Sequence, residues 1–166
     1  MALFLLSGLP GSGKTTFAGA LLASTDAVHV ESDSVRRELY SVPLYTQREH
    51  ERVFAEVERR VSRALAARRS VAVDATNLKQ LHRARYFELA ADAHVPVVAI
   101  RLVAPYPTLE KRVSGAREGH SQADVNVLRA MRGNEERFAV ATLVADTRFA
   151  VEPTVALAIQ LAADWP

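Results

Sequence analysis

The chain has 166 residues, of which 49% are hydrophobic and 24% are charged, and its formal net charge is +2. This length and balance are typical of one globular domain with its own core, and they exclude an intrinsically disordered chain. The sequence contains no cysteine, which excludes disulfides, thiol catalysis and cysteine-bound zinc. The apolar run at 2–6 is too short for a signal peptide, and no run approaches the length of a membrane span. We therefore expect a cytoplasmic protein without a membrane partner.

Apolar runs typical of strands alternate with helical patterns along the chain. We expect strands at 2–6, 27–30, 70–73, 95–102 and 148–151. We expect helices at about 13–22, 33–41, 46–65, 78–93 and 108–113, then one from 121 that continues past 133, and a last one at 153–163. This alternation predicts a single α/β domain over residues 1–166, in which helices cover both faces of a central parallel sheet of about five strands.

Two local signals define the third expected helix. Thr46 and Glu49 have the S/T-x-x-E spacing of a capping box, which marks a helix start. After them Val53, Val57 and Val61 recur every four residues and form one apolar stripe. The pattern predicts a helix that buries this stripe.

The strongest motif lies between the first expected strand and the first expected helix. There Gly8-Leu9-Pro10-Gly11-Ser12-Gly13-Lys14-Thr15 matches G-x-x-x-x-G-K-[ST], the P-loop pattern. In such a loop backbone N–H groups face phosphate oxygens, Lys14 reaches the β- and γ-phosphates, and the Thr15 hydroxyl ligates Mg²⁺. A chance glycine-rich turn is the alternative. We expect ATP and Mg²⁺ as cofactors, and the expected nucleotide-binding residues are Gly8, Pro10, Gly11, Ser12, Gly13, Lys14, Thr15 and Thr16.

A polar segment at 31–36 follows the second expected strand and faces the P-loop across the strand ends. The Asp33 carboxylate is placed to accept the proton of an attacking hydroxyl, and Arg36, one turn later, is placed to hold the acceptor. The alternative is that Asp33 caps a helix and that Arg36 lies on the surface.

The third expected strand is followed directly by Asp74, as in a Walker B motif, whose aspartate reaches Mg²⁺ directly or through water. Ala75 follows at the position where an ATPase motor carries a glutamate that activates water. The motif therefore favours phosphoryl transfer over hydrolysis. The alternative is that Asp74 and Asn77 are turn and cap residues.

Arg112 and Arg117 lie in a polar segment that we expect to form a lid over about 108–131. A mobile arginine that closes over the γ-phosphoryl group stabilises the charge that develops there, and a lid excludes water. A solvated basic loop is the alternative. The five histidines show no ligand spacing, and we expect them to be ordinary surface or core residues.

Most of the chain resembles the P-loop kinases related to polynucleotide 5′-hydroxyl kinase, through the ordered segments GLPGSGKTT, SDSVR, VDATNLKQLHRAR and LEKRVSGAREGHSQADVNVLR. The resemblance implies a kinase-type P-loop NTPase fold of three layers with a small helical lid. It implies that Lys14 and Asp33 are catalytic, with Asp33 as general base. It also implies that Arg117 is the lid arginine and that Arg112 approaches the nucleotide base. The implied acceptor-side residues are Arg36, Thr76, Asn77 and Arg83, and Ser34 stands where the family often has a second acidic residue.

Three functions fit these residues. The first is an ATP- and Mg²⁺-dependent kinase whose acceptor is a nucleic-acid or nucleotide 5′-hydroxyl, such as a single-stranded 5′ end. The second is a small-molecule kinase of the same fold, acting on a sugar, an antibiotic or a metabolite. The third is a non-catalytic nucleotide-binding switch. The resemblance favours the first, and a base at Asp33 argues against the third, because a switch needs none.

Overall fold

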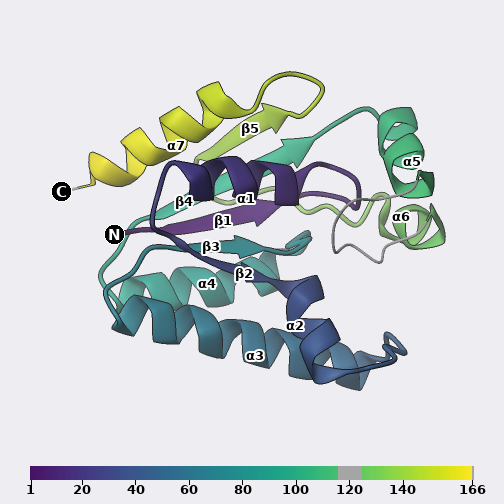
Figure 1. Ribbon diagram of the computed structural model, residues 1–166, viewed down its shortest axis with the longest axis horizontal. Helices are drawn as coiled ribbons and strands as arrows, with labels where there is room; N and C mark the ends of the chain where they lie inside the picture. The colour runs from purple at the N-terminus through teal and green to yellow at the C-terminus, as the bar shows by residue number, and fades with distance from the viewer. Residues whose placement is uncertain (116–124, 166) are drawn as a thin grey trace.

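The computed structural model describes residues 1–115 and 125–165, and its five strands form one parallel sheet in the order β2-β3-β1-β4-β5 (Figure 1). The strands are β1 (Leu3–Ser7), β2 (Val28–Glu31), β3 (Val71–Asp74), β4 (Val97–Val103) and β5 (Thr142–Asp146). The helices are α1 (Lys14–Ala23), α2 (Ser32–Leu39), α3 (Gln47–Ala66), α4 (Gln80–Asp92), α5 (Tyr106–Ser114), α6 (Val125–Met131) and α7 (Glu152–Ala163). The expected α/β fold with a parallel sheet of five strands is confirmed.

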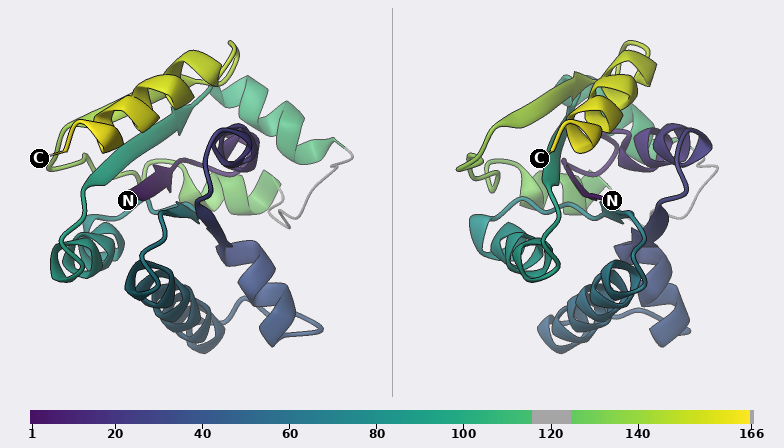
Figure 2. Two further views of the ribbon diagram at one scale, coloured as in Figure 1. Left: turned by 60° about the vertical axis from the view of Figure 1, so that its left-hand side comes forward. Right: turned by 90° about the vertical axis from the view of Figure 1, so that its left-hand side faces the viewer.

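Helices cover both faces of the sheet, as the two views of Figure 2 show, with α1 and α7 on one face and α3 and α4 on the other. Successive side chains of a strand point to opposite faces. The central strand β1 therefore contributes Phe4 and Leu6 to the first core and Leu3 and Leu5 to the second. Every residue of β1 is buried, which explains why its sequence is a continuous apolar run.

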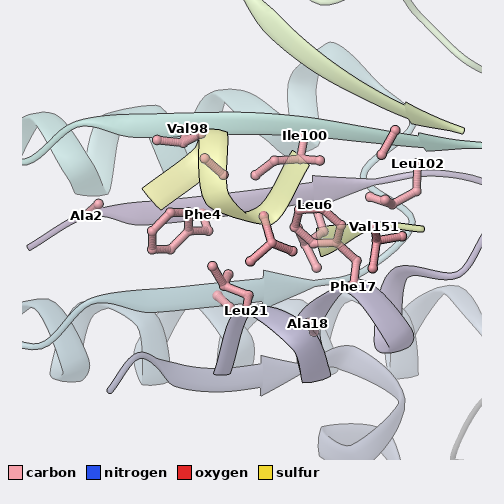
Figure 3. Close-up of a cluster of buried hydrophobic side chains, with 14 residues drawn as sticks. Ala2, Phe4, Leu6, Phe17, Ala18, Leu21, Val98, Ile100, Leu102 and Val151 are labelled. Atoms are coloured by element: carbon pink, nitrogen blue, oxygen red, sulfur yellow. The ribbon is translucent and has the colours of Figure 1, made fainter. Parts of the chain in front are cut away.

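The first core lies between the sheet and helices α1 and α7 (Figure 3). Phe17, Ala18 and Leu21 of α1 pack there against Phe4 and Leu6 of β1. Burying a large apolar side chain stabilises a fold by about 1.5–3 kcal/mol. The core thus fixes α1 against β1, and with them the ends of the loop that joins them.

The second core receives the apolar stripe of α3. Val53, Val57 and Val61 are fully buried, so the stripe predicted from sequence is confirmed. Thr46 Oγ1 accepts a hydrogen bond from the Glu49 N–H at 3.3 Å, which confirms the predicted helix start. The Glu49 carboxylate in turn accepts hydrogen bonds from two N–H groups of the α2–α3 loop, at Leu44 and Tyr45.

The predicted last strand is wrong. It was expected at 148–151 and lies at Thr142–Asp146. Asp146 instead starts a turn, because its side chain accepts from the Arg148 N–H at 3.1 Å and its carbonyl from the Phe149 N–H at 3.1 Å. β5 is an edge strand with Val144 61% exposed, so it lacks the continuous apolar run of the central strands.

Two predicted helix boundaries are also wrong. α6 ends at Met131 and does not continue past Gly133, which has φ +82°. α5 begins at Tyr106 and not at Thr108, because Pro107 fits the first turn of a helix, where its missing N–H costs nothing. The segment predicted as a lid contains α5 and α6, which share a small apolar cluster of Leu109, Val113 and Leu128. Across 1–115 and 125–165, no helix combines the length and apolar character that crossing a bilayer requires.

Candidate active site

The loop between β1 and α1 has the backbone that a P-loop requires. Gly11 and Gly13 have φ values of +78° and +90°, in the left-handed region that favours glycine. A Cβ atom on Gly8 would lie 2.6 Å from the carbonyl oxygen of Leu102, and one on Gly11 would lie 2.9 Å from the Val113 side chain. Glycine at these positions lets the loop lie directly against β4 and α5.

Lys14, the first residue of α1, turns its side chain back over this loop. Its Nζ donates to the carbonyl oxygens of Gly8 at 3.0 Å and Leu9 at 3.1 Å. The positive end of the α1 dipole lies at the same place, so charge and free N–H groups both favour phosphate there. Of the other predicted nucleotide-binding residues, Pro10 and Ser12 are buried, and Thr16 is exposed.

Asp74, the last residue of β3, joins the P-loop to β2. Its Oδ2 accepts a hydrogen bond from Thr15 Oγ1 at 3.0 Å and lies 3.3 Å from His29 Nε2. This hydrogen bond raises the pKa of His29, against the lowering effect of its partial burial. Sequence reasoning treated His29 as ordinary. Its position in β2, the strand paired with the β3 strand that ends in Asp74, is the signal that could have identified it.

The residues at this place fit a magnesium ion that is bound together with a nucleotide. Thr15 and Asp74 offer a hydroxyl and a carboxylate oxygen, which are hard ligands of the type that Mg²⁺ prefers. Within the described ranges, no group of three or more His, Asp or Glu residues is placed to hold a metal ion. Phosphate oxygens and water would therefore complete the coordination, as is usual for Mg²⁺ at nucleotide sites.

Asp33 lies in the first turn of α2, near the P-loop. Burial raises the pKa of Asp33, and the Glu31 and Asp74 carboxylates raise it further, against the lowering effect of the Lys14 ammonium group. The N-cap of α2 is Glu31, so the alternative that Asp33 caps the helix is wrong. A half-buried carboxylate with a raised pKa near the lysine of the P-loop is suited to accept a proton.

A hydrogen-bond network holds the turn that carries Asp33. Ser34 Oγ donates to the buried Glu31 carboxylate and accepts from Arg37 Nη2 at 2.8 Å. Arg37 Nη2 also lies 3.7 Å from Glu31 Oε2. Asp33 is therefore flanked by residues that tie α2 to the end of β2, and Ser34 serves as one of these ties.

Arg36 is not a surface residue, because only 5% of it is exposed. Its Nη2 lies 3.3 Å from His50 Nδ1, and its Nη1 lies 3.6 Å from Glu49 Oε2. Its guanidinium carbon is 4.9 Å from the centre of the Tyr45 ring. Among the described residues, Nη1 is buried and has no hydrogen-bond partner, although the Glu49 carboxylate lies close by.

Three rings, which we call the ring row, continue from Arg36: His50 and Phe54 of α3, and His82 of α4. The ring centres lie 4.6 Å apart for His50 and Phe54, and 5.9 Å apart for Phe54 and His82. Sequence reasoning missed this cluster. The i, i+4 spacing of His50 and Phe54 could have placed those two on one helix face, whereas His82 joins them only through tertiary packing.

Thr76 and Asn77 fasten β3 to the start of the P-loop. The Thr76 carbonyl accepts from the Gly8 N–H at 3.0 Å and from Ser7 Oγ at 3.1 Å. The buried Asn77 side chain donates from Nδ2 to the Leu6 carbonyl at 2.8 Å. These contacts support a structural role for Asn77. A contact of either residue with an acceptor stays a prediction.

Arg83 was expected to touch an acceptor phosphate, yet it is 1% exposed. Its guanidinium lies 4.1 Å from the centre of the Phe138 ring. It donates, at distances of 2.7–3.0 Å, to the backbone carbonyl oxygens of Asn77, Leu78, Glu136 and Arg137. Through these hydrogen bonds Arg83 holds the 132–141 connector between α6 and β5 against α4. The geometry therefore gives no support to the expected contact of Arg83 with an acceptor phosphate.

Arg112 of α5 joins the P-loop to the turn after β5. Its Nη1 donates to the Gly11 carbonyl at 3.2 Å and to Thr147 Oγ1 at 2.7 Å, and its Nη2 donates to the Thr147 carbonyl at 2.7 Å. Arg112 thus lies beside the P-loop, and its expected contact with a nucleotide base stays a prediction. Arg117 lies outside the described residues.

A shallow depression of about 400 Å³ lies at the opposite edge of the sheet. Its lining residues come from segments at the amino ends of the strands and from the end of α7, namely Met1, Arg68, His94, Val95, Pro96, Ala162, Ala163 and Trp165. It contains no predicted site residue, so it is separate from the site at the carboxyl ends.

A family model described as an AAA domain matches residues 3–138, which include β1 to β4 and every predicted motif. The chain belongs to this family. A curated relative of this AAA domain, an uncharacterized protein of Mycobacterium tuberculosis H37Rv, is 28% identical over 145 residues. The match covers 80% of this chain and 29% of the relative, so the chain spans less than a third of that protein.

Three solved structures share the fold of this AAA domain. The gluconokinase from Sinorhizobium meliloti 1021 has a TM-score of 0.70 and 20% identity, with 98% of this chain and 94% of that chain covered. The Mycobacterium tuberculosis APS kinase in complex with AMPPNP and APS has a TM-score of 0.72 and 18% identity, with 98% of each chain covered. A chain of the Pnkp1/Rnl/Hen1 complex has a TM-score of 0.60 and 26% identity, with 76% of this chain and 43% of that chain covered.

Proposed function

We propose that this AAA domain binds ATP with Mg²⁺ and transfers the γ-phosphoryl group to a hydroxyl of a small molecule. The observation that carries the proposal is the position of Asp33, a half-buried carboxylate that interacts with the Lys14 ammonium group of the P-loop. A base at that place serves transfer to an acceptor and has no use in a protein that only binds nucleotide. The gluconokinase and the APS kinase, the second in complex with AMPPNP, have the same fold.

Several residues of the chain have separate roles in the proposed reaction. Bound ATP supplies the phosphoryl group, and Mg²⁺ balances its charge. The P-loop N–H groups and Lys14 would hold the β- and γ-phosphates, and the Thr15 hydroxyl and the Asp74 carboxylate would hold Mg²⁺. Asp33 accepts the proton of the acceptor hydroxyl as the hydroxyl oxygen forms a bond to the γ-phosphorus, while the bond from that phosphorus to the β,γ-bridging oxygen breaks and ADP leaves. Lys14 stabilises the charge that develops on the transferred oxygens.

A second candidate acceptor is the 5′-hydroxyl of a nucleic acid or nucleotide. The order of the sequence motifs favours it, because SDSVR and VDATNLKQLHRAR follow the P-loop as in the polynucleotide-kinase group. The similarity to a chain of the Pnkp1/Rnl/Hen1 complex, at 26% identity, adds to this.

Transfer of labelled γ-phosphate from ATP tests both candidates. The acceptors are a set of small-molecule alcohols and a single-stranded oligonucleotide with a 5′-hydroxyl, each with and without Mg²⁺. We expect Mg²⁺-dependent labelling of at least one small molecule. Labelling of the oligonucleotide alone would support the second candidate. A preparation that binds ATP by calorimetry and labels no acceptor would contradict both and favour a nucleotide-binding switch.

A further inference from the structure

A single residue, Arg36, links the ring row to the helix turn that carries the proposed base Asp33. Asp33 and Arg36 lie one turn apart on α2, and Arg36 reaches His50, the first ring of the row, at 3.3 Å. The first turns of α3 and α4 carry His50 and His82, and both turns lie at the edge of the sheet to which the strand arrows point, as does the P-loop (Figure 1). An acceptor whose hydroxyl meets Asp33 is therefore close to these rings.

The two arginines on the helix that carries the base already lie close to buried carboxylates. Arg36 lies 3.6 Å from Glu49, and Arg37 lies 3.7 Å from Glu31. A carboxylate or phosphate group on the acceptor would lose its hydration there and would compete with these carboxylates for the same cations. The chemistry on this side thus disfavours an anionic acceptor.

The ring row is itself uncharged near neutral pH. Burial and the Arg36 guanidinium lower the pKa of His50, and burial and the Lys79 ammonium group lower the pKa of His82. The centres of the three rings form a triangle, with His50 and His82 6.3 Å apart, and the ring planes are tilted against one another by 31–52°. Together with Phe54, the two neutral imidazoles therefore form an aromatic cluster whose faces and edges can contact a partner ring.

Exposed apolar side chains adjoin the row in the chain. Tyr45 is 53% exposed and Leu44 72% exposed, both shortly before His50, and Leu81, next to His82, is 75% exposed. Burial raises the pKa of the Tyr45 hydroxyl, and Asp33 and Arg36 both act on it, so Tyr45 lies near the base. The segments that carry the rings thus also carry exposed apolar side chains, which a binding partner could cover.

Resting on the proposed function, we infer that the acceptor is an uncharged alcohol that carries a planar ring, and that this ring binds against His50, Phe54 and His82. Arg36 Nη1, which has no hydrogen-bond partner among the described residues, donates to a neutral oxygen of the acceptor. The hydroxyl to be phosphorylated then lies on the side of Asp33.

Two matched sets of acceptors test the inference. One set is thymidine, thymidine 3′-monophosphate and methyl riboside, and the other is 3-phenoxypropane-1,2-diol, its 4-carboxy derivative and glycerol. In any set that is phosphorylated, we expect kcat/KM to be at least about 10-fold higher for the uncharged ring compound, the scale of a ring-stacking contact. A charged or ringless member that reacts as well as the uncharged ring compound would overturn the inference.

Substitutions in the ring row give a second measurement. Phe54→Ala and His82→Ala should each raise KM for the ring compound about 10-fold and leave KM for ATP and for the ringless alcohol unchanged. His82→Phe, which keeps a ring, should restore KM, and Phe54→Leu replaces Phe54→Ala should the latter not fold. Trp165→Ala removes an exposed ring near the far end of α7 and serves as the control. Equal changes for the ring and ringless alcohols would contradict ring binding.

Histidine NMR signals separate this inference from the proposed function. With AMPPNP bound, thymidine or 3-phenoxypropane-1,2-diol should shift the ring signals of His50 and His82 and leave exposed His94 unchanged. Shifts without transfer from ATP would support ring binding against His50 and His82 and overturn the proposed function. Transfer without shifts would overturn the inference alone, and the absence of both would overturn both.

Discussion

In the proposed function, Asp33 carries the chemical step that distinguishes a kinase from a protein that only binds nucleotide. We expect Asp33→Asn to lower the rate of phosphoryl transfer by about 100-fold or more, the range of general-base catalysis, and to leave ATP binding unchanged. Steady-state transfer and calorimetry with AMPPNP measure the two effects. Asp26→Asn, at an exposed aspartate before β2, is the control and should keep full activity. An Asp33→Asn variant with near-wild-type transfer would remove Asp33 from the mechanism.

The raised pKa of Asp33 has two consequences for pH dependence. Because the base must be ionised, kcat/KM should rise with pH through an acid limb that lies above the ordinary aspartate value of about 3.9. Because the folded-state pKa is raised, ionising Asp33 costs stability as pH rises through it, so Asp33→Asn should melt no lower than the wild type at pH 7.

Removal of the Glu31 carboxylate tests the cause of the raised pKa of Asp33. Glu31 raises the pKa of Asp33, so Glu31→Gln should move the acid limb to lower pH. The pH profile of kcat/KM, measured with an acceptor that does not titrate, gives the result. A limb that stays in place would show that Glu31 has no effect on the base.

At the level of elements, Arg83 and the 132–141 connector hold α4 in place. Arg83→Ala would leave four backbone carbonyl groups without the hydrogen bonds that the Arg83 guanidinium donates. We expect the substitution to lower the free energy of unfolding by about 2–4 kcal/mol. Urea denaturation measures the change. Arg85→Ala, two residues along α4, removes only exposed ion pairs and should change stability little. Equal effects of the two substitutions would contradict the role given to Arg83.

The sequence predicts those parts of the site that depend on neighbouring residues. The P-loop and Asp33 come shortly after a predicted strand, and Asp74 directly follows one. Their motifs and their positions in the sequence are therefore enough to predict them. His29 and the ring row depend on contacts between distant segments, such as His29 with Asp74, which are 45 residues apart. Arg83 was placed correctly on α4 but given a role that its burial does not support. β5 was misplaced because an edge strand lacks the apolar signal of the central strands.

For the molecule as a whole, the site predicts that nucleotide and fold are thermodynamically linked. At 100 times its Kd, ATP with Mg²⁺ should add about 2.7 kcal/mol to the free energy of unfolding and raise Tm by several degrees. Lys14→Ala should abolish most of this shift, because it removes the ammonium group proposed to hold the phosphates. It should change the Tm of the nucleotide-free protein little, because the Lys14 side chain is only partly buried. A Lys14→Ala protein that is stabilised as much as the wild type would contradict the predicted nucleotide site.

The contacts of α4 also determine the stage of protein synthesis at which this helix can reach its native form. The Glu136 carboxylate accepts from the Gln80 N–H at 2.6 Å, so the first turn of this helix finds its cap 56 residues further along the chain. Arg83 receives two of its carbonyl partners from the same segment. During synthesis on the ribosome, α4 would therefore emerge before the carboxylate that caps its first turn. The Arg83 guanidinium, which is buried in the folded protein, would still be in contact with water. The native form of α4 would be complete only after the last third of the chain has begun to appear.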